Sequence, residues 1–135
     1  MVVQKFGGTS VADPPAIRRL VEIVRAARAR DGGGPAVVVS AMSGVTDALL
    51  AIAASAGSGR ETEAFAAIAQ LRDRHHAAAR ELAPGRSDTT LSAQIDEHFD
   101  QLAAIAKALV VLREASPRTL DVVASIGELV NSRIV

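Results

Sequence analysis

Residues 5–11 read Lys5-Phe6-Gly7-Gly8-Thr9-Ser10-Val11, and this stretch decides how the first part of the chain folds. The apolar pair Val2-Val3 before it predicts a first β-strand. After the two glycines the chain turns at Asp13-Pro14-Pro15, where a helical pattern begins. The sequence therefore predicts a strand, a loop and a helix, with a lysine at the mouth of the loop.

The loop after this strand has the chemistry of an anion site. Gly7 and Gly8 lack a Cβ, so their backbone can take positive φ and present N–H groups to a bound anion. Thr9 and Ser10 add hydroxyl donors, and Lys5 adds a mobile positive charge. A Walker A loop places its lysine after the glycines, whereas here the lysine comes first. The residues alone leave both a phosphate or carboxylate cradle and an ordinary tight turn open.

Composition indicates one domain with a core of its own. The chain has 135 residues, and 15 Lys and Arg balance 15 Asp and Glu. Zero net charge and only three aromatic residues argue against binding to nucleic acid or a membrane surface. There is no cysteine for disulfides or thiolate metal sites, and no stretch resembles a secretory signal or a membrane span. We therefore expect a cytoplasmic protein that binds neither nucleic acid nor membrane.

A helix and a second strand are predicted after the first loop. Asp13 can cap a helix that starts at Pro14 and ends at Asp31-Gly32-Gly33-Gly34-Pro35. Its apolar stripe consists of Ile17, Leu20, Val21 and Val24. The continuous apolar run Ala36-Val37-Val38-Val39 is typical of a strand covered on both faces in a parallel sheet. Strand, helix and strand form a right-handed βαβ crossover, so the predicted fold class is α/β.

A second polar loop, Ser40-Ala41-Met42-Ser43-Gly44-Val45-Thr46-Asp47, follows the second strand. Ligands of open α/β sheets collect at the carboxyl ends of strands, so we expect both loops to face one crevice. Thr46 or Asp47 can cap a helix that contains Leu49, Leu50 and Ile52, whose N-terminus would favour an anion. Plain helix capping by small polar residues is the alternative.

Two long helices are predicted next, from Gly57 to Pro84 and from Ser87 to Ser116, as a hairpin against the sheet or a partner. The second has a seam close to a heptad repeat: Leu91, Ile95, Phe99, Leu102, Ile105 or Ala106, and Leu109. His75 and His76 have no second ligand-type residue four places on, so we expect no metal site there.

The last segment contains Ser125-Ile126-Gly127-Glu128 between apolar stretches. A glycine inside an apolar helical pattern predicts a break or a close approach. Glu128 is open to two interpretations. It is either an acidic residue in the first turn of a helix or a fixed negative charge that holds a substrate ammonium.

Three blocks of this sequence resemble one enzyme family. Lys5-Phe6-Gly7-Gly8-Thr9-Ser10-Val11 resembles the amino-terminal signature of aspartokinases, the amino-acid kinases that phosphorylate the side-chain carboxylate of aspartate. The stretch from Val37 to Thr46 is similar to the second block of that family, and Ser125-Ile126-Gly127-Glu128 to its Ser-x-Gly-Glu block. The block from Ser40 to Thr46 speaks against a relative that acts on glutamate or carbamate.

The resemblance implies an incomplete three-layer αβα amino-acid-kinase fold, similar to carbamate kinase, with a mostly parallel sheet and a long helical hairpin. Residues 1–135 would be the amino-terminal, substrate-binding part of the kinase domain. The nucleotide-binding half and the regulatory ACT domains of the family would be absent, and this part alone would be inactive. An unpaired sheet edge and bare helix faces would favour self-association as a homo-oligomer.

The resemblance also implies a phosphate side of the site. Lys5 would stabilise the phosphoryl group during transfer from ATP, which would arrive with Mg²⁺. The other residues expected at the phosphates are Gly7, Gly8, Thr9 and Ser10.

On the substrate side, Ser40 and Thr46 would contact L-aspartate, and Glu128 would hold its α-amino group. The product would be 4-phospho-L-aspartate, at the head of lysine, threonine and methionine synthesis. A non-catalytic helical module, which binds an anion at the loops or a partner through residues 60 to 115, is the alternative from a different functional class.

Overall fold

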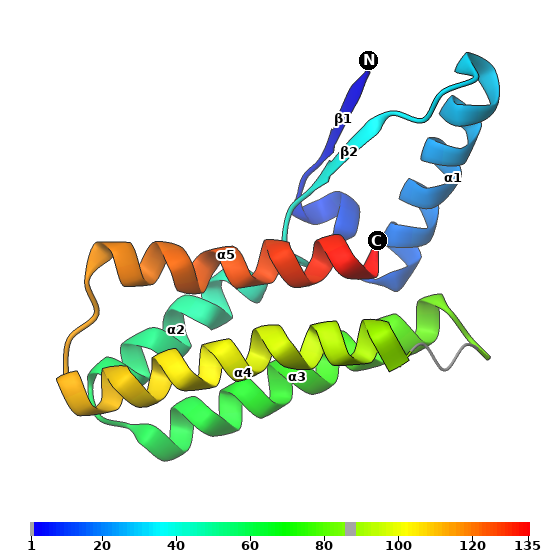
Figure 1. Ribbon diagram of the computed structural model, residues 1–135. Helices are drawn as coiled ribbons and strands as arrows, with labels where there is room; N and C mark the ends of the chain where they lie inside the picture. The colour runs from blue at the N-terminus through cyan, green and yellow to red at the C-terminus, as the bar shows by residue number, and fades with distance from the viewer. Residues whose placement is uncertain (1, 86–88) are drawn as a thin grey trace.

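The computed structural model describes residues 2–85 and 89–135, which form an L-shaped molecule (Figure 1). One arm holds two short strands and a helix, and the other is a layered bundle of four helices. In chain order the elements are β1 (Val3–Phe6), the 3-10 turn η1 (Gly8–Val11), α1 (Pro14–Asp31), β2 (Ala36–Val39), α2 (Val45–Gly57), α3 (Glu61–Leu82), α4 (Thr89–Leu112) and α5 (Pro117–Ile134). Within residues 2–85 and 89–135, none of the helices combines the length and the hydrophobicity that a transmembrane segment requires.

The first helix, α1, begins and ends where its sequence predicts. Asp13 Oδ1 accepts a hydrogen bond of 2.9 Å from the N–H of Ala16, and Pro14 is the first helical residue. At the other end Gly32 takes a left-handed φ of 65°, which a residue with a side chain adopts only at a cost. Capping at both ends therefore fixes the length of the helix between the two strands.

The strands β1 and β2 lie side by side and pair in parallel, from Val3 opposite Ala36 to Phe6 opposite Val39. The predicted strand-helix-strand unit is confirmed. The first strand is longer than predicted, so Lys5 lies within it. Both strands end at the same side of the sheet, which places the two polar loops next to one another.

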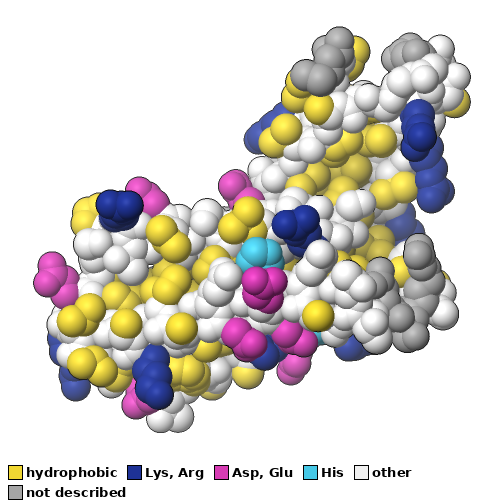
Figure 2. All heavy atoms as spheres, in the orientation of Figure 1, with side chains coloured by type: hydrophobic (Ala, Val, Ile, Leu, Met, Phe, Trp, Pro, Cys, Tyr) yellow, Lys and Arg dark blue, Asp and Glu magenta, His cyan; other side chains and the backbone are white. Residues whose placement is uncertain are grey.

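The strand β2 is more exposed than its sequence predicts. Val37 and Val38 are 37% and 48% exposed, so the prediction of coverage on both faces is wrong for this chain. Within the described residues β2 has β1 as its single neighbouring strand. Its surface borders an open groove of about 570 Å³ between α1, β2 and α5, where Figure 2 shows hydrophobic side chains gathered in the hollow of the L.

The helices α2 to α5 bury the main core. The buried residues of α4 are Ile95, Phe99, Leu102, Ala106 and Leu109. They confirm the predicted seam, with Ala106 rather than Ile105 in the core and Leu91 half-buried at one end. Packing of this stripe against α2, α3 and α5 makes the bundle a stable platform for the loops.

The predicted boundaries of the two long helices are too wide. Gly57 is the last residue of α2 rather than the first of the next helix, and α3 ends at Leu82. α4 stops at Leu112 instead of continuing to Ser116, because Arg113 takes a left-handed φ of 57°. The predicted start at Ser87 lies outside the described residues.

Gly127 marks a close approach and not a break, because α5 runs through it without interruption. A Cβ at Gly127 would lie 2.8 Å from Val45 Cγ1, 2.9 Å from Ala41 Cβ and 3.2 Å from Leu49 Cδ1. Distances below 3.0 Å leave no room for a methyl group unless its neighbours move. Only glycine lets the middle of α5 lie this close to the start of α2.

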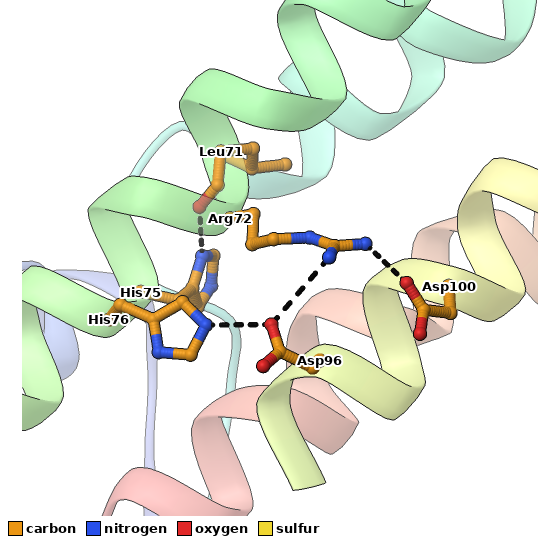
Figure 3. A network of polar contacts seen from close by, with 6 residues as sticks. All are labelled: Leu71, Arg72, His75, His76, Asp96 and Asp100. Carbon is orange, nitrogen blue, oxygen red and sulfur yellow. Dashed lines mark hydrogen bonds and ion pairs between the residues drawn. The ribbon is translucent and has the colours of Figure 1, made fainter. Parts of the chain in front are cut away.

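Polar side chains join α3 and α4 on their outer side (Figure 3). The Arg72 guanidinium reaches Asp100 at 2.6 Å and Asp96 at 3.6 Å, and His76 Nε2 lies 2.8 Å from Asp96. The Asp96 and Asp100 side chains are 43% and 71% exposed, so each ion pair contributes at most about 1 kcal/mol. The network therefore adds little to the stability of the hairpin.

His75 is the buried histidine of the bundle, with no exposed surface. Its Nδ1 lies 2.7 Å from the Leu71 carbonyl, and its ring packs against Phe99 at 5.2 Å between centroids. Because a carbonyl can only accept, Nδ1 carries the proton of the neutral ring and Nε2 is left as an acceptor. Burial is the main cause that lowers the pKa of His75 below its ordinary value.

We predict that the free energy of unfolding falls as the pH is lowered below about 6.5, the ordinary pKa of histidine. The unfolded chain takes up a proton at His75 in this range, whereas the folded chain resists protonation because the ring is buried. The contribution of neutral His75 to the free energy of unfolding is therefore complete above about pH 6.5 and declines below it. Urea unfolding at pH 7.5 and 5.5 measures the change. In the His75→Leu variant this part of the decline should vanish, whereas His76→Gln, on the outer side of α3, should retain it. An equally steep decline in His75→Leu would contradict the prediction.

We predict that Gly127→Ala lowers the free energy of unfolding by about 1–2 kcal/mol. Overpacking costs about 1–3 kcal/mol, and two contacts under 3.0 Å place Gly127 in the upper part of this range, at about 2–3 kcal/mol. The better helix propensity of alanine offsets about 1 kcal/mol of it. Gly33→Ala is the matched control, since a Cβ there meets nothing within 4 Å. Urea unfolding should show it within about 0.5 kcal/mol of the parent. Equal stability of the two variants would mean that the approach of α5 is not close.

Candidate functional site

A cavity of about 420 Å³ lies beyond the carboxyl end of β2, between the two polar loops and the middle of α5. Five of the predicted site residues line it: Gly8, Thr9, Ser40, Thr46 and Glu128. They come from three sequence blocks that are far apart in the chain. The predicted crevice is therefore present, and the fold brings the third block to it as well.

The other predicted site residues lie beside the cavity rather than on its wall. Lys5 is exposed near the end of β1, and its Nζ lies 3.8 Å from the position that a Cβ would take on Gly7. The Ser10 N–H donates a hydrogen bond of 2.9 Å to the Gly7 carbonyl within the turn. Within the described part of the chain Lys5 makes no ion pair, so its charge is available to a ligand.

The glycines of the first loop do not adopt the positive φ that the sequence suggests. Gly7 is extended, with φ −75° and ψ 174°, and Gly8 opens the 3-10 turn η1 with a negative φ. A Cβ on Gly8 would lie 3.6 Å from the Ala41 carbonyl, which is an ordinary van der Waals contact. Neither conformation nor lack of space therefore requires a glycine at this position.

The second loop leaves β2 and turns into α2. The Ser40 N–H donates to the Phe6 carbonyl at 3.1 Å, and the turn closes with a 3.1 Å bond from the Val45 N–H to the Met42 carbonyl. Gly44 precedes the helix with a left-handed φ of 76°. The prediction that Thr46 or Asp47 caps α2 is wrong, since Gly44 holds the N-cap position and no side chain caps the helix.

α5 presents Glu128 to this loop. Glu128 lies in the middle of the helix, so its interpretation as a first-turn residue is wrong. Its side chain is exposed and borders both the cavity and the apolar groove. The adjacent Gly127 lets α5 approach closely enough to place this carboxylate opposite Ser40 and Thr46.

Two side chains that the sequence did not single out hold the second loop. Arg74 on α3 donates to the Ser43 carbonyl at 2.9 Å and to the Ala12 carbonyl at 3.5 Å, which ties the two loops together. Asn131 on α5 donates from Nδ2 to the Ser40 carbonyl at 2.6 Å. For Asn131, the one signal in the sequence was a polar residue within the apolar pattern of the last helix.

The cavity has the chemistry of a site for a small ligand with an ammonium group. Its charged lining residues are Glu128 and Asp47, which the sequence suggested only as a helix cap. Hydroxyl groups of Thr9, Ser40 and Thr46 add donors, and the N-terminus of α2 adds a partial positive charge. Among the described residues no three His, Asp or Glu side chains lie close enough together to hold a metal ion.

Comparison with known proteins agrees with this geometry. The model of the amino acid kinase family matches residues 1–135. Lysine-sensitive aspartokinase 3 of Escherichia coli is 32% identical over 132 residues, which are 98% of this chain and 27% of that protein. Bifunctional aspartokinase/homoserine dehydrogenase 2 of Arabidopsis thaliana is 32% identical over 127 residues, 94% of this chain and 13% of that protein.

A solved structure is similar in fold as well. The crystal structure of E. coli aspartokinase III in complex with aspartate and ADP superposes with a TM-score of 0.80 at 31% identity. The match covers 99% of this chain and 27% of that one. This chain thus spans about a quarter of the length of the E. coli enzyme. The helical arm, the short parallel sheet and the family match over residues 1–135 lead to one conclusion: the chain belongs to the amino acid kinase family.

Proposed function

We propose that this chain forms the aspartate-binding part of an aspartate kinase. The observation that carries the proposal is the cavity in which Ser40, Thr46 and Glu128 meet the first glycine-rich loop. The similar E. coli protein was crystallised with aspartate and ADP, which supports the same ligands here. The reaction would move the γ-phosphoryl group of ATP to the β-carboxylate of L-aspartate and give 4-phospho-L-aspartate, the first step toward lysine, threonine and methionine.

On the substrate side, Glu128 pairs with the α-ammonium of L-aspartate, since it is a carboxylate of the cavity without an ion pair among the described residues. Ser40 and Thr46 offer hydroxyl groups to the ligand from the opposite wall. Phosphoryl transfer needs positioning more than a protein nucleophile, so a set of binding groups is sufficient.

On the phosphate side, Lys5 neutralises charge on the group in transfer, and Gly7, Gly8, Thr9 and Ser10 give backbone and hydroxyl donors. The Lys5 ammonium lies beside Gly7 and has no ion pair among the described residues, which supports this role. The described residues form no metal site of their own, so Mg²⁺ stays an expectation from the family. Assembly of several copies and a cytoplasmic location are part of the proposal, and the exposed β2 valines favour association.

Titration calorimetry with L-aspartate tests the proposed site, with D-aspartate and L-glutamate as controls. We expect heat from L-aspartate alone, because Glu128 and the two loops fix three points of the ligand. A folded chain that binds none of the three ligands would contradict an aspartate site in these residues and favour the non-catalytic module.

In the same titration Glu128→Gln should weaken L-aspartate binding by about 10- to 100-fold, since it removes one charge of a pair worth about 1.5–3 kcal/mol. Glu97→Gln is the control: Glu97 is exposed on α4 and borders none of the cavities described. Equal affinity of the two variants would remove Glu128 from the substrate site.

The role of Lys5 can be tested in a chimera in which residues 1–135 replace the matching segment of E. coli aspartokinase 3. We expect Lys5→Ala to lower kcat for L-aspartate by about 10²-fold or more, with less effect on KM, because its charge acts mainly in the transition state. Lys107→Ala, an exposed lysine on α4, should leave kcat unchanged. Full turnover in the Lys5 variant would disprove the catalytic assignment.

A further inference from the structure

Asn131 is a polar residue at a fully buried position of α5, with no exposed surface. Its neighbours in the helix at this depth, Ile126 and Val130, are apolar. A polar side chain at such a position is tolerated only if it makes specific hydrogen bonds. The bond that Asn131 makes leads out of the bundle to the loop after β2, through Nδ2 and the Ser40 carbonyl at 2.6 Å.

The Ser40 backbone is therefore held from two sides. Its N–H donates to the Phe6 carbonyl of β1 at 3.1 Å, which extends the strand pairing by one residue. Its carbonyl receives the Asn131 amide of α5 instead of a partner in the sheet. Ser40 is thus fixed between the sheet and the bundle, at the point where its side chain reaches the cavity.

Asn131 and Glu128 lie three residues apart on the same helix, which makes them neighbours on one face. One helix turn therefore supplies both a carboxylate of the cavity and the anchor of the loop opposite to it. Any shift of α5 moves the two together. The Oδ1 atom of Asn131 has no hydrogen-bond partner within the described residues. The side chain thus directs its donor to the Ser40 carbonyl and leaves its acceptor unused.

We propose that Asn131 is a positioning residue, which sets the place of Ser40 and its loop relative to Glu128. This inference rests on the proposed aspartate site and adds a residue that touches no ligand. On this proposal, the distance between α5 and the end of β2 is fixed, and this distance makes the site specific for a short amino acid. In a variant without the Asn131 amide, the Ser40 hydroxyl is still present, but the Ser40 carbonyl loses the donor that fixes its position.

Two variants of the full 135-residue chain test the proposal. Asn131→Leu keeps the branched shape of the side chain, with two larger methyl groups in place of the amide, and removes the donor. Asn131→Ala removes the donor and leaves space. Ser132→Ala is the matched control, because Ser132 is exposed and its hydroxyl donates to the Leu129 carbonyl of its own helix, at 2.7 Å, with no other partner among the described residues. Urea unfolding identifies the variants that fold.

The decisive signal is the carbonyl carbon of Ser40 in the NMR spectrum, because its chemical shift depends on the bond that it accepts. In either folded Asn131 variant we expect this signal to move upfield and the amide signals of residues 40–46 to change. L-Aspartate affinity should fall about tenfold, with both measures unchanged in Ser132→Ala. A residue that only fills the core would alter stability and leave the Ser40 signal in place.

Two results would overturn the inference: an unchanged Ser40 signal in a folded variant, or a shifted signal with full affinity for L-aspartate. A parent chain that binds no L-aspartate would instead contradict the proposed function. In that case the signals of residues 40–46 still decide whether Asn131 positions the loop. If both variants fail to fold, coupling across the hydrogen bond between Asn131 Nδ2 and the Ser40 carbonyl carbon in the parent chain decides it, and its absence would disprove the anchor.

Discussion

The close contact of α5 with the start of α2 is the constraint on which the candidate site depends. At Gly127 the helix backbone lies against Val45 and Ala41, where even one methyl group has no room. This contact, together with the hydrogen bond from Asn131 to Ser40, brings the last block of the sequence to the first two. A helix held farther away, by the width of one side chain, would leave Glu128 and Asn131 out of reach of the loop that they face.

The bundle acts as a frame for loops that have little structure of their own. Side chains from α3 and α5 donate hydrogen bonds to three backbone carbonyls of the loops, at Ala12, Ser40 and Ser43. Binding groups on loops are precise only when a rigid scaffold fixes them. The buried core of α2 to α5 provides that scaffold. The small parallel sheet directs both loops to the same side, because its two strands run in the same direction.

The local features of the fold could be predicted from the sequence, because each depends on a few neighbouring residues. The Asp13 cap, the core seam of α4 and the grouping of the loops are confirmed. Features set by distant residues could not be predicted. They include the extended Gly7, the glycine cap of α2 and the Asn131 anchor. The exposure of β2 belongs with them, since coverage of a strand depends on what lies beside it in space. At Gly127 the sequence predicted a break or a close approach, and only the structure decides for the close approach and shows its partners.

The pairing of elements across the chain has a consequence for the order in which the molecule folds. The antiparallel helices α3 and α4 follow each other directly, so their contacts close short loops and form early. The glycine-rich loop, by contrast, is synthesised long before α5, the helix that supplies the third wall of the cavity. At typical rates of synthesis that delay is on the order of ten seconds. During it the nascent chain has two of the three walls of its cavity and cannot yet hold a ligand between them.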